Sequence, residues 1–293
     1  MKNTQEIFIR DPYIVTNRDK GLYYMFGSTD PNVWQGRCEG FDYYTSRNLR
    51  EWDGPFPAFK PEEFFWSHEN FWAPEVHFYQ GRWHMFASFK APGVARGTQI
   101  LVSDAPDKPF TPWSDGPVTP SKDECLDGTL FVDEQGKPWM VYCHEWTQIK
   151  NGTMCAIELS QDLRTALGKP VLLFDAASCS QVKRNPEENY VTDGPCLRRN
   201  RKGELLMLWS SYGQQGYFVA TARAPGGQVT GPWVHDSELL VSHDAGHPML
   251  FESLDGQLMM ALHQNSAQPH DYALFYPVEE DGKGKIRLKG KAL

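Results

Sequence analysis

The sequence has almost no amphipathic stretch long enough for a helix and no continuous apolar run that could span a membrane. Its first residues, 1–6, do not contain the apolar core of a signal peptide, so we expect an intracellular protein unless an N-terminal segment has been removed. These absences argue against a helical bundle and against a membrane partner, and they direct attention to β-structure.

Cysteine and basic side chains are also scarce. The six cysteines are irregularly spaced and form no Cys-x-x-Cys pair, which is typical of buried free thiols and argues against a disulfide framework or a zinc site. Asp and Glu number 37 against 29 Lys and Arg, and the net charge of −8 disfavours a nucleic-acid-binding surface. We therefore expect no nucleic-acid partner.

What the sequence does contain is a short phrase that occurs five times. In each copy a glycine is followed four residues later by a methionine, within an apolar run. The glycines are Gly21, Gly81, Gly136, Gly203 and Gly256, and the methionines are Met25, Met85, Met140, Met207 and Met260. The intervals of 60, 55, 67 and 53 residues indicate a series of similar structural units.

Each unit has the pattern of several short strands. The glycine marks a turn that leads into a buried strand, another apolar run precedes it, and a further strand candidate follows. Several units then end in a turn with a tryptophan, as at Trp52, Trp113 and Trp233. About four strands in each of five units predict an all-β fold, a five-bladed β-propeller that occupies residues 1–293 as a single domain.

Candidate functional side chains lie nine or ten residues before each repeated glycine. They are Asp11, Trp72, Asp127, Asp193 and His247. Because equivalent positions in a propeller converge on its axis, we expect these side chains around one small cavity. A single carboxylate before a strand is often only a turn former, but three in one register of a repeat repel each other and need another explanation.

Four motifs at these places resemble glycoside hydrolase family 43, a family of five-bladed propellers that includes arabinofuranosidases, arabinanases and xylosidases. The resemblance covers nearly the whole chain, and its motifs are Arg10-Asp11-Pro12, Trp72-Ala73-Pro74-Glu75, Asp127-Gly128 and Thr192-Asp193-Gly194-Pro195. It implies an inverting glycosidase, exo-acting on α-L-arabinofuranosyl or β-D-xylosyl linkages, with an oligosaccharide or polysaccharide as substrate. Such an enzyme is expected to show a bell-shaped dependence of rate on pH.

The resemblance also implies roles for the three aspartates. Asp11 is the expected general base, and Asp127 is expected to tune the pKa of the acid and to orient the substrate. The family has Glu before the Gly-Pro of the fourth unit, whereas this chain has Asp193, whose carboxyl group lies about 1.5 Å further back. Asp193 is the expected acid, with Glu145 and then Glu188 as alternatives.

Two other functions stay open at this point. A site whose acid is misplaced can lose on the order of 10²-fold in rate, so a propeller that binds sugar without cleaving it is one alternative. A related five-bladed hydrolase with another sugar specificity is the second, although the Trp72-Ala73-Pro74-Glu75 motif favours family 43.

Four further side chains are expected to contact the substrate: Trp72, Glu75, Glu145 and His247. Arg10 is expected to face away from the sugar, because neighbouring side chains of a strand point in opposite directions. No cofactor is expected to be required. The resemblance places His247 at the central channel, where some members hold calcium or water, so calcium is the metal that it allows.

Aromatic side chains gather in the loops near the first two units. They are Trp34, Phe65, Trp66, Phe71 and Trp72. They form either a floor for a sugar ring or ordinary packing between units.

Overall fold

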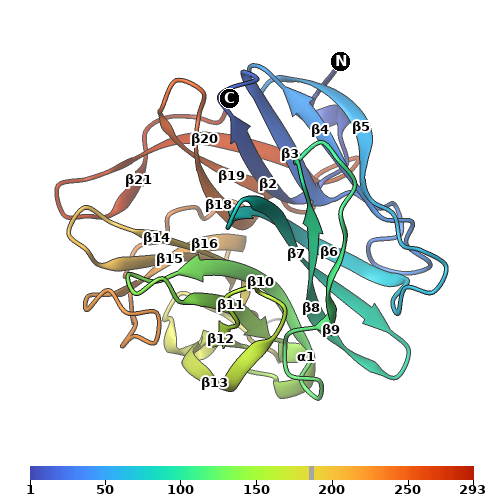
Figure 1. The fold of residues 1–293 in the computed structure, drawn as a ribbon. Helices are drawn as coiled ribbons and strands as arrows, with labels where there is room; N and C mark the ends of the chain where they lie inside the picture. The colour runs from blue at the N-terminus through green and yellow to red at the C-terminus, as the bar shows by residue number, and fades with distance from the viewer. Residues whose placement is uncertain (185–187) are drawn as a thin grey trace.

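The computed structural model describes residues 1–184 and 188–293. Its strands form five antiparallel sheets arranged radially around a centre, which confirms the predicted five-bladed propeller (Figure 1). No helix in the described ranges is long and apolar enough to cross a membrane.

Each sheet consists of strands that are consecutive in the chain. Blade one contains β1 (Lys2–Asn3), β2 (Arg10–Asn17), β3 (Leu22–Ser28), β4 (Phe41–Ser46) and β5 (Glu51–Phe59). Blade two contains β6 (Glu69–Tyr79), β7 (Arg82–Ala91), β8 (Val94–Ser103) and β9 (Thr111–Pro117). Blade three contains β10 (Cys125–Val132), β11 (Pro138–His144), β12 (Thr153–Leu159) and β13 (Ala166–Asp175).

The last two blades repeat this plan. Blade four contains β14 (Asp193–Arg199), β15 (Leu205–Gly213), β16 (Gly216–Ala224) and β17 (Val234–His235). Blade five contains β18 (Ala245–Glu252), β19 (Leu258–Gln264), β20 (Tyr272–Glu280) and β21 (Ile286–Leu288). The described part of the chain also contains three short helices, η1 (Thr4–Glu6), α1 (Trp146–Ile149) and η2 (Ala176–Ser178).

The repeated glycine–methionine phrase builds the hairpin between the first two strands of every blade. All five glycines have positive φ, from 60° to 84°, a conformation that glycine adopts without a steric penalty. All five methionines are fully buried, and each one lies in a different hydrophobic cluster. Every cluster spans two neighbouring blades, so the hydrophobic core of this protein lies between the blades, and the methionines pack one blade against the next.

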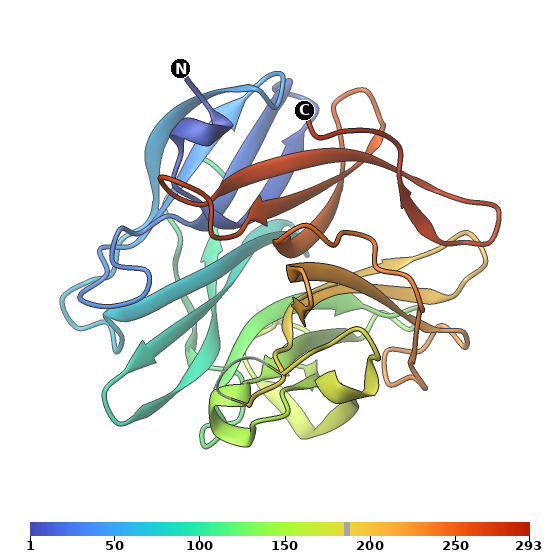
Figure 2. The ribbon, with the colours of Figure 1, turned by 180° about the vertical axis from the view of Figure 1, so that it is seen from behind.

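The ring is closed where blade five meets blade one, and within the described residues no strand is exchanged between these two sheets. Side chains from both blades share one hydrophobic cluster, including Trp52 and Phe275, whose ring centroids are 5.7 Å apart. Arg18 pairs with Glu252 at 2.9 Å, and the Ile9 N–H donates to the Asp271 carbonyl. Figure 2 shows the first and last blades, blue and red, lying side by side.

All six cysteines are free thiols, as the sequence predicts, and five of them are buried.

Candidate active site

A β-bulge interrupts the first strand of every blade at the same place. The register with the second strand shifts there, and one residue in each bulge has a positive φ between 46° and 56°. These residues are Asp11, Ala73, Asp127, Gly194 and His247. The alignment made from the sequence is therefore wrong by one residue in blades two and four. It selected Trp72 and Asp193, whereas the bulge residues there are Ala73 and Gly194.

The bulges are fixed by a second repeat that the sequence analysis did not detect. Seven residues after each repeated glycine stand Ser28, Ser88, Cys143, Ser210 and His263. Four of these side chains accept the N–H of the bulge residue in the following blade, at distances of 2.8–3.1 Å. The exception is Cys143, because a thiol is a weak acceptor, and the Gly194 N–H instead donates to Asp127 Oδ2 at 2.9 Å.

One cavity of about 370 Å³ lies over these bulges. Its lining comes from all five blades and from the segments that connect their strands; it consists of Arg10, Asp11, Val33, Trp34, Trp72, Leu126, Asp127, Glu145, Trp146, Val191, Asp193, Tyr212, Tyr217 and His247. The three aspartates, His247, Trp72 and Glu145 are thus brought together, as expected from the sequence. The volume is at the small end of the range for ligand pockets, about 300–1,000 Å³.

Three expected positions differ in the structure. Glu75 is buried beside His77, at 3.0 Å, and does not line the cavity. Glu188 is exposed and is not part of the lining either. Arg10 does line the cavity, contrary to the expectation from strand alternation, because the bulge at Asp11 breaks that alternation.

The aromatic residues near blades one and two divide between the two expected roles. Phe65, Trp66 and Phe71 pack into the hydrophobic cluster between these blades. Trp34 and Trp72 line the cavity, with their ring centroids 5.6 Å apart in an edge-to-face arrangement. Trp34 is 62% exposed, so one of its faces is available to a ligand.

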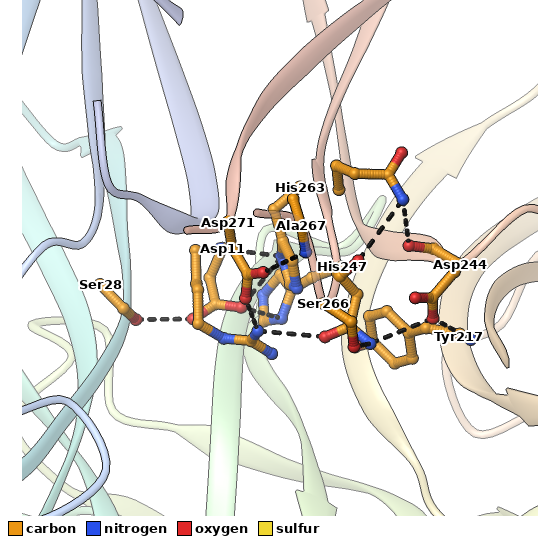
Figure 3. A network of polar contacts seen from close by, with 12 residues as sticks. Asp11, Ser28, Tyr217, Asp244, His247, His263, Ser266, Ala267 and Asp271 are labelled. Carbon is orange, nitrogen blue, oxygen red and sulfur yellow. Dashed lines mark hydrogen bonds and ion pairs between the residues drawn. The ribbon is translucent and has the colours of Figure 1, made fainter. Parts of the chain in front are cut away.

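His247 lies between two of the carboxylates. Its Nδ1 is 3.1 Å from Asp11 Oδ1 (Figure 3). The same nitrogen is 3.8 Å from Asp127 Oδ2. Burial alone would lower the pKa of His247, but the charges of Asp11 and then Asp127 outweigh it and raise the pKa to about 10. At neutral pH His247 is therefore an imidazolium that holds both carboxylates.

Asp11 is the most strongly stabilised anion of the site. Burial opposes ionisation, but the charge of His247 and its hydrogen bond keep the pKa of Asp11 well below its ordinary value. The Ser28 hydroxyl also donates to Asp11 Oδ2 at 2.6 Å. Asp11 is consequently ionised throughout the physiological pH range.

His263 contributes differently from His247. Its Nδ1 accepts the Asp11 N–H at 3.1 Å, so this nitrogen carries no proton, and burial holds the pKa of His263 well below its ordinary value. Although the same nitrogen lies 3.5 Å from Asp11 Oδ1, a neutral ring with an acceptor there forms no ion pair with that oxygen. His263 is thus a neutral support for the backbone of Asp11.

Asp193 is held in the opposite state. Burial, and next the negative charge of Asp127, raise the pKa of Asp193 to about 8. Burial also raises the pKa of Asp127, to about 6, although the His247 charge opposes this shift. The Tyr217 hydroxyl donates to Asp193 Oδ2 at 3.2 Å. At neutral pH Asp193 therefore carries a proton.

Glu145 lines the same cavity but is paired with a cation. The Arg96 Nε lies 3.3 Å from Glu145 Oε2, and both side chains are buried. The Arg96 guanidinium also stacks on Trp72, 3.7 Å from the ring centroid. Arg96 thus engages Glu145 directly, and Asp193 is the better placed proton donor of the two.

The described residues contain no group of three or more His, Cys, Asp or Glu side chains arranged to hold a metal ion. A calcium ion at His247 therefore stays a prediction from the resemblance.

Comparison with known proteins agrees with the five-bladed fold. A solved structure of an endo-arabinase from Bacteroides thetaiotaomicron VPI-5482 is 35% identical with a TM-score of 0.89, covering 96% of this chain and 97% of that one. A thermostable family-43 glycoside hydrolase shares the fold, with 22% identity and a TM-score of 0.83, covering 99% of this chain and 97% of that one.

A curated relative, alpha-L-arabinofuranosidase 43 of Humicola insolens, is 25% identical over 269 residues. The match covers 84% of this chain and 52% of the relative, so the chain spans about half of that protein. The sequence model of glycosyl hydrolases family 43 matches residues 4–276, and the chain therefore belongs to this family of glycoside hydrolases.

Proposed function

We propose that this protein is an inverting, exo-acting glycosidase that releases terminal α-L-arabinofuranosyl groups from plant-type glycans. The observation that supports this most is the pairing of an ionised Asp11 with a protonated Asp193 in one cavity. Direct displacement by water needs one carboxylate to accept a proton and one carboxylic acid to donate one.

The proposed reaction uses these two groups together. A water molecule transfers a proton to Asp11 as its oxygen bonds to the anomeric carbon. The bond from that carbon to the leaving oxygen breaks, and the proton of Asp193 passes to this oxygen. Asp127 keeps the pKa of Asp193 high, and the ion pair with His247 holds the Asp11 carboxylate in position. The protons exchange with solvent afterwards, which restores both groups.

Two facts support the choice of sugar and of mode. The relatives with the higher identities, an endo-arabinase at 35% and an arabinofuranosidase at 25%, favour arabinose, whereas the xylanase and xylosidase structures that match are 21% identical or less. The cavity is small, and Trp34 and Trp146 both stand in its wall, which favours a short terminal segment over a long chain lying across the site. The endo-arabinase is the main argument for the alternative, internal cleavage of arabinan.

The first experiment measures hydrolysis of 4-nitrophenyl α-L-arabinofuranoside, the β-D-xylopyranoside and linear arabinan by wild type and Asp11→Asn. We expect the arabinofuranoside to be cleaved, arabinose to be the only early product from arabinan, and Asp11→Asn to lose about 10²- to 10⁴-fold in kcat. Early release of oligosaccharides would show internal cleavage. Unchanged turnover in Asp11→Asn would contradict the assignment of the base.

A second experiment identifies the acid. A nitrophenolate leaves with little help from an acid, whereas the alcohol of a natural linkage needs a full proton. We expect Asp193→Asn to lose far more activity on arabinobiose than on the nitrophenyl substrate, and Glu145→Gln to lose similar factors on both. The reverse pattern would assign the acid to Glu145, and inactive wild type on all substrates would favour a protein that only binds sugar.

A further inference from the structure

The residues that directly precede the five bulge residues occupy equivalent positions in the five blades. They are Arg10, Trp72, Leu126, Asp193 and Gly246. Four of them line the cavity, and the fifth has no side chain because the Tyr217 ring fills that space: a Cβ on Gly246 would lie 2.4 Å from the ring. Arg10 therefore occupies in blade one the position that Asp193, the proposed acid, occupies in blade four.

Arg10 is held from one end of its guanidinium. Its Nη1 donates to Asn265 Oδ1 at 3.1 Å and to the carboxylate of Asp271, both from the loop between β19 and β20. The guanidinium carbon lies 4.8 Å from the centroid of the exposed Trp34 ring. Five N–H groups are available on arginine, and within the described residues the three on Nε and Nη2 donate to no protein acceptor.

The charge of Arg10 is already balanced. Asp271 pairs with it directly, and the ionised Asp11 is the adjacent residue in the chain. An anionic ligand is therefore not needed to neutralise Arg10 in the cavity. The fork of a guanidinium instead matches two neighbouring oxygen acceptors, such as adjacent hydroxyl groups on a neutral sugar ring.

We propose that Arg10 is a substrate-binding residue that donates hydrogen bonds to two adjacent oxygens of the sugar being released. This inference rests on the proposed function, because it places that sugar between the Asp11 and Asp193 carboxyl groups. The Asp271 and Asn265 contacts fix the guanidinium before the sugar binds, so little side-chain freedom is lost on binding. Sugars without the paired oxygens are then poor substrates.

The test compares wild type, Arg10→Lys and Arg10→Met on the best 4-nitrophenyl pentoside and on its monodeoxy analogues. We expect Arg10→Met to lose about 10- to 100-fold in kcat/KM on the parent sugar. On the deoxy analogue that lacks the contacted hydroxyl, wild type and Arg10→Met should agree within about threefold. Arg10→Lys keeps the charge without the fork and should resemble Arg10→Met. Arg18→Met, at an exposed arginine paired with Glu252, is the matched control and should equal wild type.

An equal loss on every analogue would overturn the proposal, since it would show that Arg10 acts only by placing its neighbours. If Arg10→Met does not fold because Asp271 is left unpaired, the double variant Arg10→Met/Asp271→Asn serves in its place. If wild type is inactive, the proposed function is contradicted. Calorimetric titration of wild type and Arg10→Met with L-arabinose and D-xylose then tests whether Arg10 binds sugar. Binding that weakens about 10-fold or more in the variant would support the inference, and no binding by wild type would end it.

Discussion

At the scale of single residues, the site depends on four ionisable side chains whose pKa values are set by each other. Asp11 and His247 form an ion pair, which leaves Asp127 and Asp193 to share the remaining negative charge. Of these two, Asp193 has the higher pKa, because burial and the Asp127 charge raise it by more than the His247 charge lowers it. The proton of the site therefore resides on Asp193 at neutral pH, and the rate must fall when that proton is lost.

The alkaline limb of the pH–rate profile tests this arrangement. We expect kcat/KM to fall above about pH 8, where Asp193 ionises, and the acidic limb to lie well below pH 6, because Asp11 stays ionised there. A phenol that donates to a carboxylate stabilises the ionised form and lowers its pKa. Removing this donor in Tyr217→Phe should move the alkaline limb to higher pH, as measured on the nitrophenyl substrate.

The control for this shift is Tyr276→Phe, which removes a hydroxyl that contacts His243 away from the cavity. Its profile should match that of wild type. An alkaline limb that moves to lower pH in Tyr217→Phe would show that Asp193 is not the titrating group.

At the residue scale, the sequence predicted which side chains form the site better than it predicted the directions in which they point. Asp11, Asp127, Asp193 and His247 could be found because the repeat aligns them. The orientation of Arg10 could not, since strand alternation predicts the wrong side and only the bulge corrects it. A signal was nevertheless present: the serines and the histidine seven residues after the repeated glycines mark the acceptors that hold the bulges.

At the scale of the strand, the bulge converts a regular β-strand into a support for catalysis. Each bulge residue adopts a left-handed conformation that costs a non-glycine residue roughly 1–2 kcal/mol. Four blades accept this cost, for Asp11, Ala73, Asp127 and His247, and in each of them the backbone N–H of the bulge residue donates a hydrogen bond that offsets it. Strand positions and the role of the repeated methionines could be predicted, whereas the backbone angles of the bulges depend on neighbouring blades.

Gly194 offers a test at this scale. Its φ is +51°, and a Cβ there would lie 2.8 Å from His247 Cγ. We expect Gly194→Ala to lower Tm and also to lower kcat by about 10-fold or more, because His247 is pushed away from its position beside Asp11. Both quantities are measured by thermal unfolding and by hydrolysis of the nitrophenyl substrate.

Gly203→Ala is the matched control. Gly203 has a φ of +84° and lies in the same blade, but a Cβ there meets nothing within 4 Å. It should lower Tm through the backbone alone and leave kcat unchanged. Equal losses of kcat in both variants would contradict the proposed contact.

At the scale of the whole molecule, five hydrophobic clusters between the blades hold the ring, and the buried Asp193 at its centre reduces stability. Asp193 has a native pKa of about 8 against an ordinary value of 3.8, so the folded protein retains a proton that the unfolded chain releases. The contribution of Asp193 to the free energy of unfolding therefore decreases from about pH 4 to pH 8, and the full loss is present above pH 8. This is a cost of function, because the raised pKa is what makes Asp193 a proton donor.

Asp193→Asn removes the titrating group while keeping an acceptor for Tyr217. We expect its Tm to exceed that of wild type by more at pH 9 than at pH 5, as measured by calorimetry. Asp19→Asn, at an exposed position, is the control and should show no such dependence on pH. A difference in Tm that is the same at both pH values would indicate that Asp193 is not a buried acid with a raised pKa.

The junction between the first and last blades has a consequence for the order of assembly. The proposed base and its neighbour Arg10 come from the first blade, whereas His247, His263 and Asp271 come from the last. During synthesis the blade that emerges last supplies the positive charge beside a carboxylate that was made first. Earlier intermediates contain the acidic residues without their counter-charge and are expected to be inactive, so recovery of catalysis during refolding reports the final docking of blade five rather than the formation of any single sheet.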